Sequence, residues 1–207
     1  WLAGGMTLLP TLKLRLAAPS DLIDLAQIEE LKGIELRDGK LVVAAMTLHD
    51  QVARSNVVQE NIPALAVLAG GIGDAQVRNR GTIGGSVSNS DPAADYPAAV
   101  LGLNATVETT RRMHAADEFF TAMFETALEP GELLTSVSFP IPDRAGYIKF
   151  PNPASRYAIV GVMVAQTGSE VRVAVTGAGA NAFRVPEMEQ ALAANFSPEA
   201  LLGITVS

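Results

Sequence analysis

Two glycine clusters beside hydroxyl side chains give the clearest chemical signal in this sequence. The first reads Ala3-Gly4-Gly5-Met6-Thr7, and the second reads Thr82-Ile83-Gly84-Gly85-Ser86. Glycine tolerates positive φ and has no Cβ, so consecutive backbone N–H groups can converge on one point and bind phosphate oxygens. For either cluster taken alone, the sequence favours the simpler interpretation of a tight turn between strands. Neither has the glycine spacing of a dinucleotide-binding strand–turn–helix or of a P-loop.

Charged side chains lie close to the second cluster. Asp95 follows it, and a carboxylate there can accept hydrogen bonds from the hydroxyl groups of a ligand. Asp91 and Asp95 can also simply cap a helix that starts near Pro97. Arg78 and Arg80 either offset phosphate charge or are solvated surface residues.

The remaining candidate side chains favour structural roles. His49 and His114 are interpreted as surface or cap-adjacent histidines, because nothing in the sequence pairs them. Trp1 and Tyr157 can stack on a planar ligand or pack in a core, and the sequence alone favours the core.

The composition excludes several classes of protein. The chain has 207 residues, 15 Lys+Arg against 22 Asp+Glu, 2 His and no Cys. It therefore has no disulfide, thiolate metal site or iron–sulfur ligand, and its acidic balance argues against nucleic-acid binding. The longest apolar runs are too short to span a bilayer, and no basic-then-apolar signal peptide opens the chain. We expect one or two domains of a soluble, cytoplasmic protein.

Strands are expected around the first glycine cluster. The alternation over residues 12–16 favours a half-buried strand, although a short helix ending before Pro19 is possible. Residues 22–28 are ambiguous between helix and strand. Asp38-Gly39 between two alternating apolar runs predicts a hairpin.

Helices are expected before the second cluster. Thr47 predicts the start of a helix over 48–55, and Pro63 opens another that stops at Gly70-Gly71. The stretch 73–86 is polar, glycine-rich and too long for a simple turn.

The second half of the chain predicts a mixture of strands and helices. Pro151 and Pro153 mark a boundary, and Ser197 caps the last helix. Strands are expected over 106–109, 133–139 and the hairpin 158–166 and 171–176, and helices over 98–103, 117–123, 185–194 and 198–202.

Four stretches together resemble one known family. They are LAGGMTLLPTLKLRL, IGDAQVRNRGTIGGSVSNSDPAADYPAAVLGL, GELLTSVSFPIP and KFPNPASRYAIVGVMVA. They resemble the FAD-binding medium subunit of the molybdenum hydroxylases, the carbon monoxide dehydrogenase and xanthine dehydrogenase group, in the family's order and over most of the chain.

The resemblance implies an α+β fold: a two-subdomain PCMH-type FAD-binding domain followed by a small C-terminal antiparallel sheet with helices. It assigns residues 1–150 to the FAD-binding domain, without the family's first βα segment, and 151–207 to a C-terminal domain without the usual final helix. It also implies that residues 22–28 are a strand.

The same resemblance implies a set of FAD-binding residues and no catalytic side chain or metal ligand. Ala3, Gly4, Gly5, Met6 and Thr7 would form the first phosphate loop, and Thr82, Ile83, Gly84 and Gly85 the second. Asn89 and Asp95 would contact ribityl or adenosine hydroxyls, and Ile72 and Gly81 would line the cleft. Leu134 would lie on the adenine side and Tyr157 over one flavin face. Met6 stands where Thr or His is common, so one phosphate hydrogen bond is lost or is made by Thr7.

The implied function is electron transfer. An iron–sulfur small subunit with [2Fe–2S] clusters and a molybdopterin large subunit would be partners, as a dimer of heterotrimers, and FAD would pass electrons to an external acceptor. A self-contained FAD-dependent oxidase is an alternative, although neither His lies near Gly4-Gly5 for covalent attachment. A non-catalytic nucleotide-binding module is another.

Overall fold

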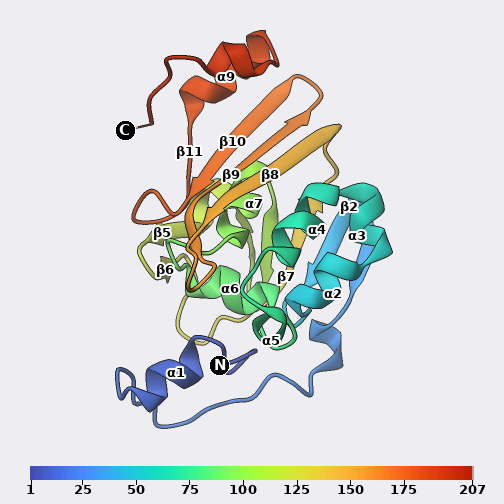
Figure 1. The fold of residues 1–207 in the computed structure, drawn as a ribbon. Helices are drawn as coiled ribbons and strands as arrows, with labels where there is room; N and C mark the ends of the chain where they lie inside the picture. The colour runs from blue at the N-terminus through green and yellow to red at the C-terminus, as the bar shows by residue number, and fades with distance from the viewer. Residues whose placement is uncertain (207) are drawn as a thin grey trace.

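The computed structural model describes residues 1–206 and contains two main antiparallel sheets with helices packed against them (Figure 1). The N-terminal segment runs along one end of the molecule, and the C-terminal helix α9 (Pro186–Ala194) covers the other end. This architecture confirms the α+β prediction. Within the described residues no helix is long and apolar enough to cross a bilayer.

The first sheet has five antiparallel strands in the order β1-β2-β7-β3-β4. Asp38 and Gly39 both have positive φ, 52° and 72°, which gives the turn of the predicted hairpin and pairs Ile34 with Val43. The strands are β1 (Ile34–Arg37), β2 (Lys40–Ala44), β7 (Leu134–Pro140), β3 (Thr106–Thr109) and β4 (Met113–Ala115).

Six short helices lie between β2 and β3 along the chain. Pro63 occupies the first turn of the third, as predicted, and this helix ends at Gly70 with Gly71 as its C-cap. The helices are α2 (His49–Arg54), α3 (Asn56–Asn61), α4 (Pro63–Gly70), α5 (Ala75–Arg78), α6 (Ile83–Asn89) and α7 (Tyr96–Gly102). The sequence patterns missed α3, α5, which lies inside the stretch 73–86, and α6, which begins inside that stretch and continues to Asn89.

The second sheet has four antiparallel strands in the order β11-β10-β9-β8. Val171, Val173 and Val175 share the face that packs against Leu192 of α9, as the alternation predicted. The opposite face packs on α7 through Met163 and Ala174, in one core with the first sheet. The strands are β8 (Arg144–Pro151), β9 (Ala158–Thr167), β10 (Glu170–Thr176) and β11 (Phe183–Arg184).

Further elements are short and lie outside the two main sheets. They are η1 (Glu29–Leu31), α8 (Ala116–Phe119), the paired strands β5 (Phe120–Ala122) and β6 (Glu125–Thr126), and η2 (Pro198–Leu201). The predicted domain boundary at residue 150 falls inside β8, and the division into domains 1–150 and 151–207 stays a prediction.

Both strand predictions near the N-terminus are wrong. Residues 12–16 are not a strand: they overlap α1 (Leu8–Lys13), which confirms the alternative of a short helix ending before Pro19, and Leu14 and Leu16 are 71% and 75% exposed. The alternation there does not reflect a buried face. Residues 22–28 do not form a strand. Their one β-type pairing is an isolated parallel bridge between Asp24 and Leu2.

Three further predictions need correction. Thr47 does not cap α2, because its hydroxyl exchanges hydrogen bonds with the backbone of Gly33 at 2.9 and 3.1 Å. The helix expected over 117–123 ends at Phe119, and the chain continues as β5. The helix expected over 198–202 is a 3-10 turn without a side-chain cap from Ser197.

Candidate functional site

A cavity of about 500 Å³ opens between the N-terminal loop, α6 and the loop that follows β8. A volume of this size suits a small-molecule or cofactor site. The predicted site residues lie far apart in the sequence, yet all of them except Ile83 line this cavity. The side chain of Ile83 is fully buried in the core instead. Arg78 and Arg80 lie outside the cavity lining.

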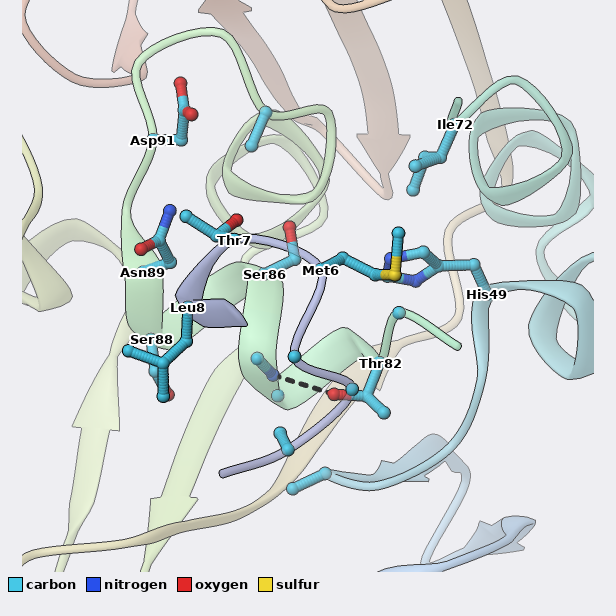
Figure 2. A pocket seen from close by; sticks show the side chains of 18 of the residues that line it. Met6, Thr7, Leu8, His49, Ile72, Thr82, Ser86, Ser88, Asn89 and Asp91 are labelled. Carbon is cyan, nitrogen blue, oxygen red and sulfur yellow. Dashed lines mark hydrogen bonds between the residues drawn. The ribbon is translucent and has the colours of Figure 1, made fainter. Parts of the chain in front are cut away.

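The two glycine clusters are in direct contact with each other. A Cβ added to Gly4 would overlap the carbonyl oxygen of Arg80, and one added to Gly85 would lie 3.4 Å from the Cβ of Ala3. Figure 2 shows the N-terminal loop passing the first turn of α6, near Thr82. Glycine at residue 4 therefore permits the close approach that joins the two halves of the site.

The backbone donors that remain free belong to the first cluster. Among residues 1–206, the N–H groups of residues 5–8 have no hydrogen-bond acceptor, and these residues line the cavity. Gly5 has a positive φ of 74°, which turns the chain just before α1. Several free N–H groups beside one cavity form an arrangement that binds an anion such as pyrophosphate.

The second cluster differs because its N–H groups already have acceptors. Ile83 donates to the carbonyl of Thr47 at 3.1 Å, and Gly84 donates to that of Ala45 at 2.9 Å. Gly85 donates to the hydroxyl of Thr82 at 3.1 Å, which caps α6. This cluster fixes the start of α6 against β2, and its contact with pyrophosphate stays a prediction.

Polar side chains project from the other end of α6. Figure 2 shows Ser88, Asn89 and Asp91 on one side of the cavity and Ile72 and His49 on the opposite side. Within the described chain the Asn89 side chain makes no hydrogen bond, so it is free to bind a ligand. The carboxylate of Asp91 accepts from the N–H of Ala93 at 2.9 Å.

Asp95 lies at the cavity wall with both carboxylate oxygens already bonded. The hydroxyl of Tyr147 donates at 2.5 Å, and the Lys149 ammonium lies 2.9 Å away. Burial raises the pKa of Asp95 above its ordinary value, while the Tyr147 and Lys149 contacts oppose that rise. Asp95 precedes α7 but makes no side-chain cap, so the capping interpretation is wrong for it.

Leu134 and Tyr157 approach the cavity from the two sheets. Leu134 begins β7 and is buried, and Tyr157 lies in the loop between β8 and β9, 43% exposed. Burial raises the pKa of the Tyr157 hydroxyl. The ring of Tyr157 is thus accessible for stacking on a planar ligand, and the predicted core position is wrong.

The interpretation of the histidines as surface or cap-adjacent residues is correct only in part: His49 does follow the N-cap residue of α2, but neither histidine lies on the surface. His49 is 4% exposed and lines the cavity, and His114 is 7% exposed with Nε2 3.3 Å from Glu132. Their burial depends on contacts with residues distant in the sequence, such as Tyr96 for His49 and Glu132 for His114, so no local pattern indicated it. His49 is a site residue that sequence reasoning missed.

Glu132 is a second missed residue of the cavity wall. Its carboxylate accepts hydrogen bonds from the hydroxyl of Thr109 at 2.6 Å and from the N–H of Glu129 at 2.9 Å. These two bonds, with His114 and Arg112, lower the pKa of Glu132 to about 2. The network holds the chain ahead of Leu134 in place.

The comparisons with known proteins agree with this site. Residues 1–142 match the family described as the FAD binding domain in molybdopterin dehydrogenase. The glyceraldehyde dehydrogenase medium chain of Sulfolobus acidocaldarius is 34% identical over 201 residues, covering 91% of this chain and 71% of that protein. The carbon monoxide dehydrogenase medium chain of Hydrogenophaga pseudoflava is 36% identical over 195 residues, covering 88% and 68%.

Solved structures show the same fold. Carbon monoxide dehydrogenase from Hydrogenophaga pseudoflava superposes with a TM-score of 0.90 at 36% identity, over 97% of this chain and 74% of that one. Quinoline 2-oxidoreductase from Pseudomonas putida 86 superposes with a TM-score of 0.83 at 30% identity, over 98% and 78%. This chain therefore belongs to the family of FAD-binding domains of molybdopterin dehydrogenases, and its cofactor is FAD.

The residues of the cavity fit this cofactor. The free N–H groups of residues 5–8 suit the pyrophosphate, and the hydrogen-bonding side chain of Asn89 suits hydroxyl groups. Apolar and aromatic side chains, including Ile72, Leu134 and Tyr157, suit flat rings.

Proposed function

We propose that this chain is the FAD-carrying medium subunit of a molybdenum-containing dehydrogenase assembled from several subunits. In this proposal a partner subunit oxidises the substrate, and the electrons leave through the FAD held by this chain to an external acceptor. The observation that carries the proposal is the cavity in which the two glycine clusters meet, within a chain of the FAD-binding family.

The chain's own residues bind and orient the cofactor. We assign the pyrophosphate to the N–H groups of residues 5–8, with the hydroxyl of Thr7 as a further donor. We assign Asn89 and Asp95 to ribityl or adenosine hydroxyls. The Asp95 oxygens would accept a hydrogen bond from such a hydroxyl in addition to those from Tyr147 and Lys149. Leu134 is assigned to the adenine side and Tyr157 to one flavin face.

FAD supplies the redox chemistry when it is bound, since it takes up and releases electrons reversibly. The protein contributes an enclosed site that fixes the position of the ring and keeps part of it from water. No side chain of this chain is assigned a catalytic role.

The partners are inferred from the relatives. Several matching proteins are described as medium chains or medium subunits, among them nicotine 6-hydroxylase medium subunit from Paenarthrobacter nicotinovorans, 35% identical over 209 residues. The present sequence has no cysteine, so thiolate-bound [2Fe–2S] clusters would lie on a partner. We propose an iron–sulfur small subunit and a molybdopterin large subunit, arranged as a dimer of heterotrimers.

Affinity purification of the tagged full chain from its native source tests this proposal. We expect a yellow protein with bound FAD, together with two further subunits that contain iron and molybdenum. Purification of a folded chain with FAD but without such partners would contradict the multi-subunit assignment. A folded chain that neither retains nor rebinds FAD would contradict the site as well.

A further inference from the structure

The imidazole of His49 occupies a position on the cavity wall that its contacts within the fold do not explain. Its backbone N–H donates to the carbonyl of Gly81 at 3.0 Å, and its ring lies beside Tyr96 with the centroids 5.3 Å apart. A Cβ added to Gly81 would lie only 2.5 Å from the Nε2 atom of His49. Gly81 thus leaves the space that the imidazole occupies beside the cavity.

The polar atoms around this ring are not satisfied by the protein. The Nδ1 atom of His49 is buried without a hydrogen-bond partner in the described chain. The hydroxyl of Tyr96 is also unpaired there, but Tyr96 does not line the cavity and is assigned no contact with the ligand. An unpaired buried polar group reduces stability, so its presence in a native fold requires an explanation. His114 shows the contrast, because its buried imidazole is paired with Glu132.

His49 is uncharged at neutral pH. Burial lowers the pKa of its imidazole to about 4, and the positive charge of Arg78 contributes in the same direction. A neutral imidazole offers one N–H donor and one nitrogen acceptor but no charge to bind pyrophosphate. Its chemistry therefore suits an uncharged ring with hydrogen-bonding edges.

The cavity wall around His49 is also uncharged and mainly apolar. His49 and Ile72 lie on the side of the cavity opposite Ser88, Asn89 and Asp91 (Figure 2). Val77, which also lines the cavity, and Ile72 make this side apolar. An apolar wall with one neutral hydrogen-bonding group is the usual setting for a heteroaromatic ring.

We propose that His49 recognises a nitrogen heterocycle of the bound FAD through a hydrogen bond between its imidazole and the ring edge. This inference rests on the proposed FAD site and adds a recognition residue to it. The isoalloxazine and the adenine of FAD share the required chemistry, so the experiment must separate the two.

Binding measurements on the full chain after removal of FAD test the proposal. We expect H49F to weaken FAD binding by about tenfold, because an aromatic ring remains while the hydrogen bond is lost. H49Q keeps an uncharged donor and acceptor and should recover most of the affinity. Tyr96→Phe is the matched control, since Tyr96 does not line the cavity, and it should leave the affinity unchanged.

A measurement of thermal unfolding without FAD separates recognition from a structural role. If His49 only supports the fold, H49F will change the unfolding temperature of the FAD-free chain and leave FAD affinity intact, which overturns the proposal. If the proposal is correct, the FAD-free H49F chain will be at least as stable as the wild type, because an unpaired buried nitrogen has been removed.

FMN and ADP identify the ring. Weaker binding of FMN but not ADP by H49F assigns His49 to the isoalloxazine, and the reverse assigns it to the adenine. Equal weakening of both would place His49 at the phosphates and overturn the proposal. Absence of FAD binding in the wild type would contradict the FAD site itself, whereas wild-type binding with unaffected H49F and H49Q would contradict the His49 inference alone.

Discussion

The ammonium group of Lys149 lies 2.9 Å from the carboxylate of Asp95, and this buried pair joins the second sheet to the FAD cavity. Lys149 also donates to the carbonyl oxygens of Gly71 at 2.8 Å and of Arg156 at 3.0 Å. One side chain of β8 therefore connects the end of α4, the start of α7 and the loop that carries Tyr157. The position of that loop over the cavity depends on this connection.

Substitution of Lys149 by methionine is expected to destabilise the protein strongly. It would leave the Asp95 carboxylate, which is 4% exposed, with Tyr147 as its remaining side-chain partner. Loss of one member of a buried pair costs about 3–5 kcal/mol. Urea unfolding of the FAD-free chain would measure this change in the free energy of unfolding.

The exposed pair of Arg54 and Asp50 provides the control for Lys149. The Arg54 side chain is 80% exposed, so Arg54→Met should cost less than about 1 kcal/mol. Equal losses for Lys149→Met and Arg54→Met would show that the buried pair has no special role.

Stability of the FAD-free protein is expected to depend on His49 below neutral pH. The pKa of His49 is lowered from 6.5 to about 4, so between these pH values the imidazole is protonated in the unfolded chain but not in the folded chain. The free energy of unfolding is therefore unaffected by this proton above pH 6.5, and it decreases as the pH falls from 6.5 toward 4. At about 1.4 kcal/mol per pH unit, the loss amounts to roughly 3 kcal/mol.

The variant His49→Phe removes this titrating group. Its free energy of unfolding should change less than that of the wild type between pH 6.5 and pH 4. Parallel pH profiles for the two proteins would contradict a neutral, buried imidazole at residue 49.

Gly84 is expected to be required for packing, in addition to its predicted contact with the pyrophosphate. A Cβ there would lie 2.6 Å from the Cβ of Ala45 and 2.7 Å from its carbonyl oxygen, so Gly84→Ala must displace α6 from β2. Such overpacking costs about 1–3 kcal/mol, measured by unfolding of the FAD-free chain. Gly146→Ala is the control, because nothing lies within 4 Å of its added Cβ. A Gly84→Ala chain that keeps full stability but loses FAD would reverse this assignment.

The hydroxyl of Thr7 is expected to contribute to FAD binding. Thr7 lines the cavity beside the free N–H groups, and Thr7→Val keeps its shape while removing one hydrogen-bond donor. Calorimetry should show FAD affinity reduced by about tenfold. Thr11, whose hydroxyl donates to the Thr7 carbonyl, lies outside the cavity lining, so Thr11→Val should bind FAD normally. Similar affinity in both variants and the wild type would remove Thr7 from the site.

The parts of the fold with strong local signals could be predicted from the sequence. The turn at Asp38-Gly39 requires two positive φ values, and that dipeptide favours them. The alternation of Val171, Val173 and Val175 correctly identified a buried face, because α9 covers it. The glycine clusters marked the place where two distant segments meet, and the family resemblance supplied the cofactor.

Other features depend on contacts that the sequence does not display. The leucines of residues 12–16 alternate, but no neighbouring strand pairs with them, and they overlap a short helix. Nothing near His49 in the sequence reveals that Gly81 and Tyr96 enclose it. The pairing of Asp95 with Lys149 joins the residue before α7 to strand β8, more than fifty positions later in the chain, so no local pattern predicts it.

The most direct test of the proposed site is the FAD content of the purified full chain together with its equilibrium affinity for FAD. We predict one FAD per folded chain and an affinity that falls in Thr7→Val and in His49→Phe but not in Thr11→Val or Tyr96→Phe. A folded chain that binds no FAD, or whose FAD affinity is the same in all four variants, would contradict this prediction.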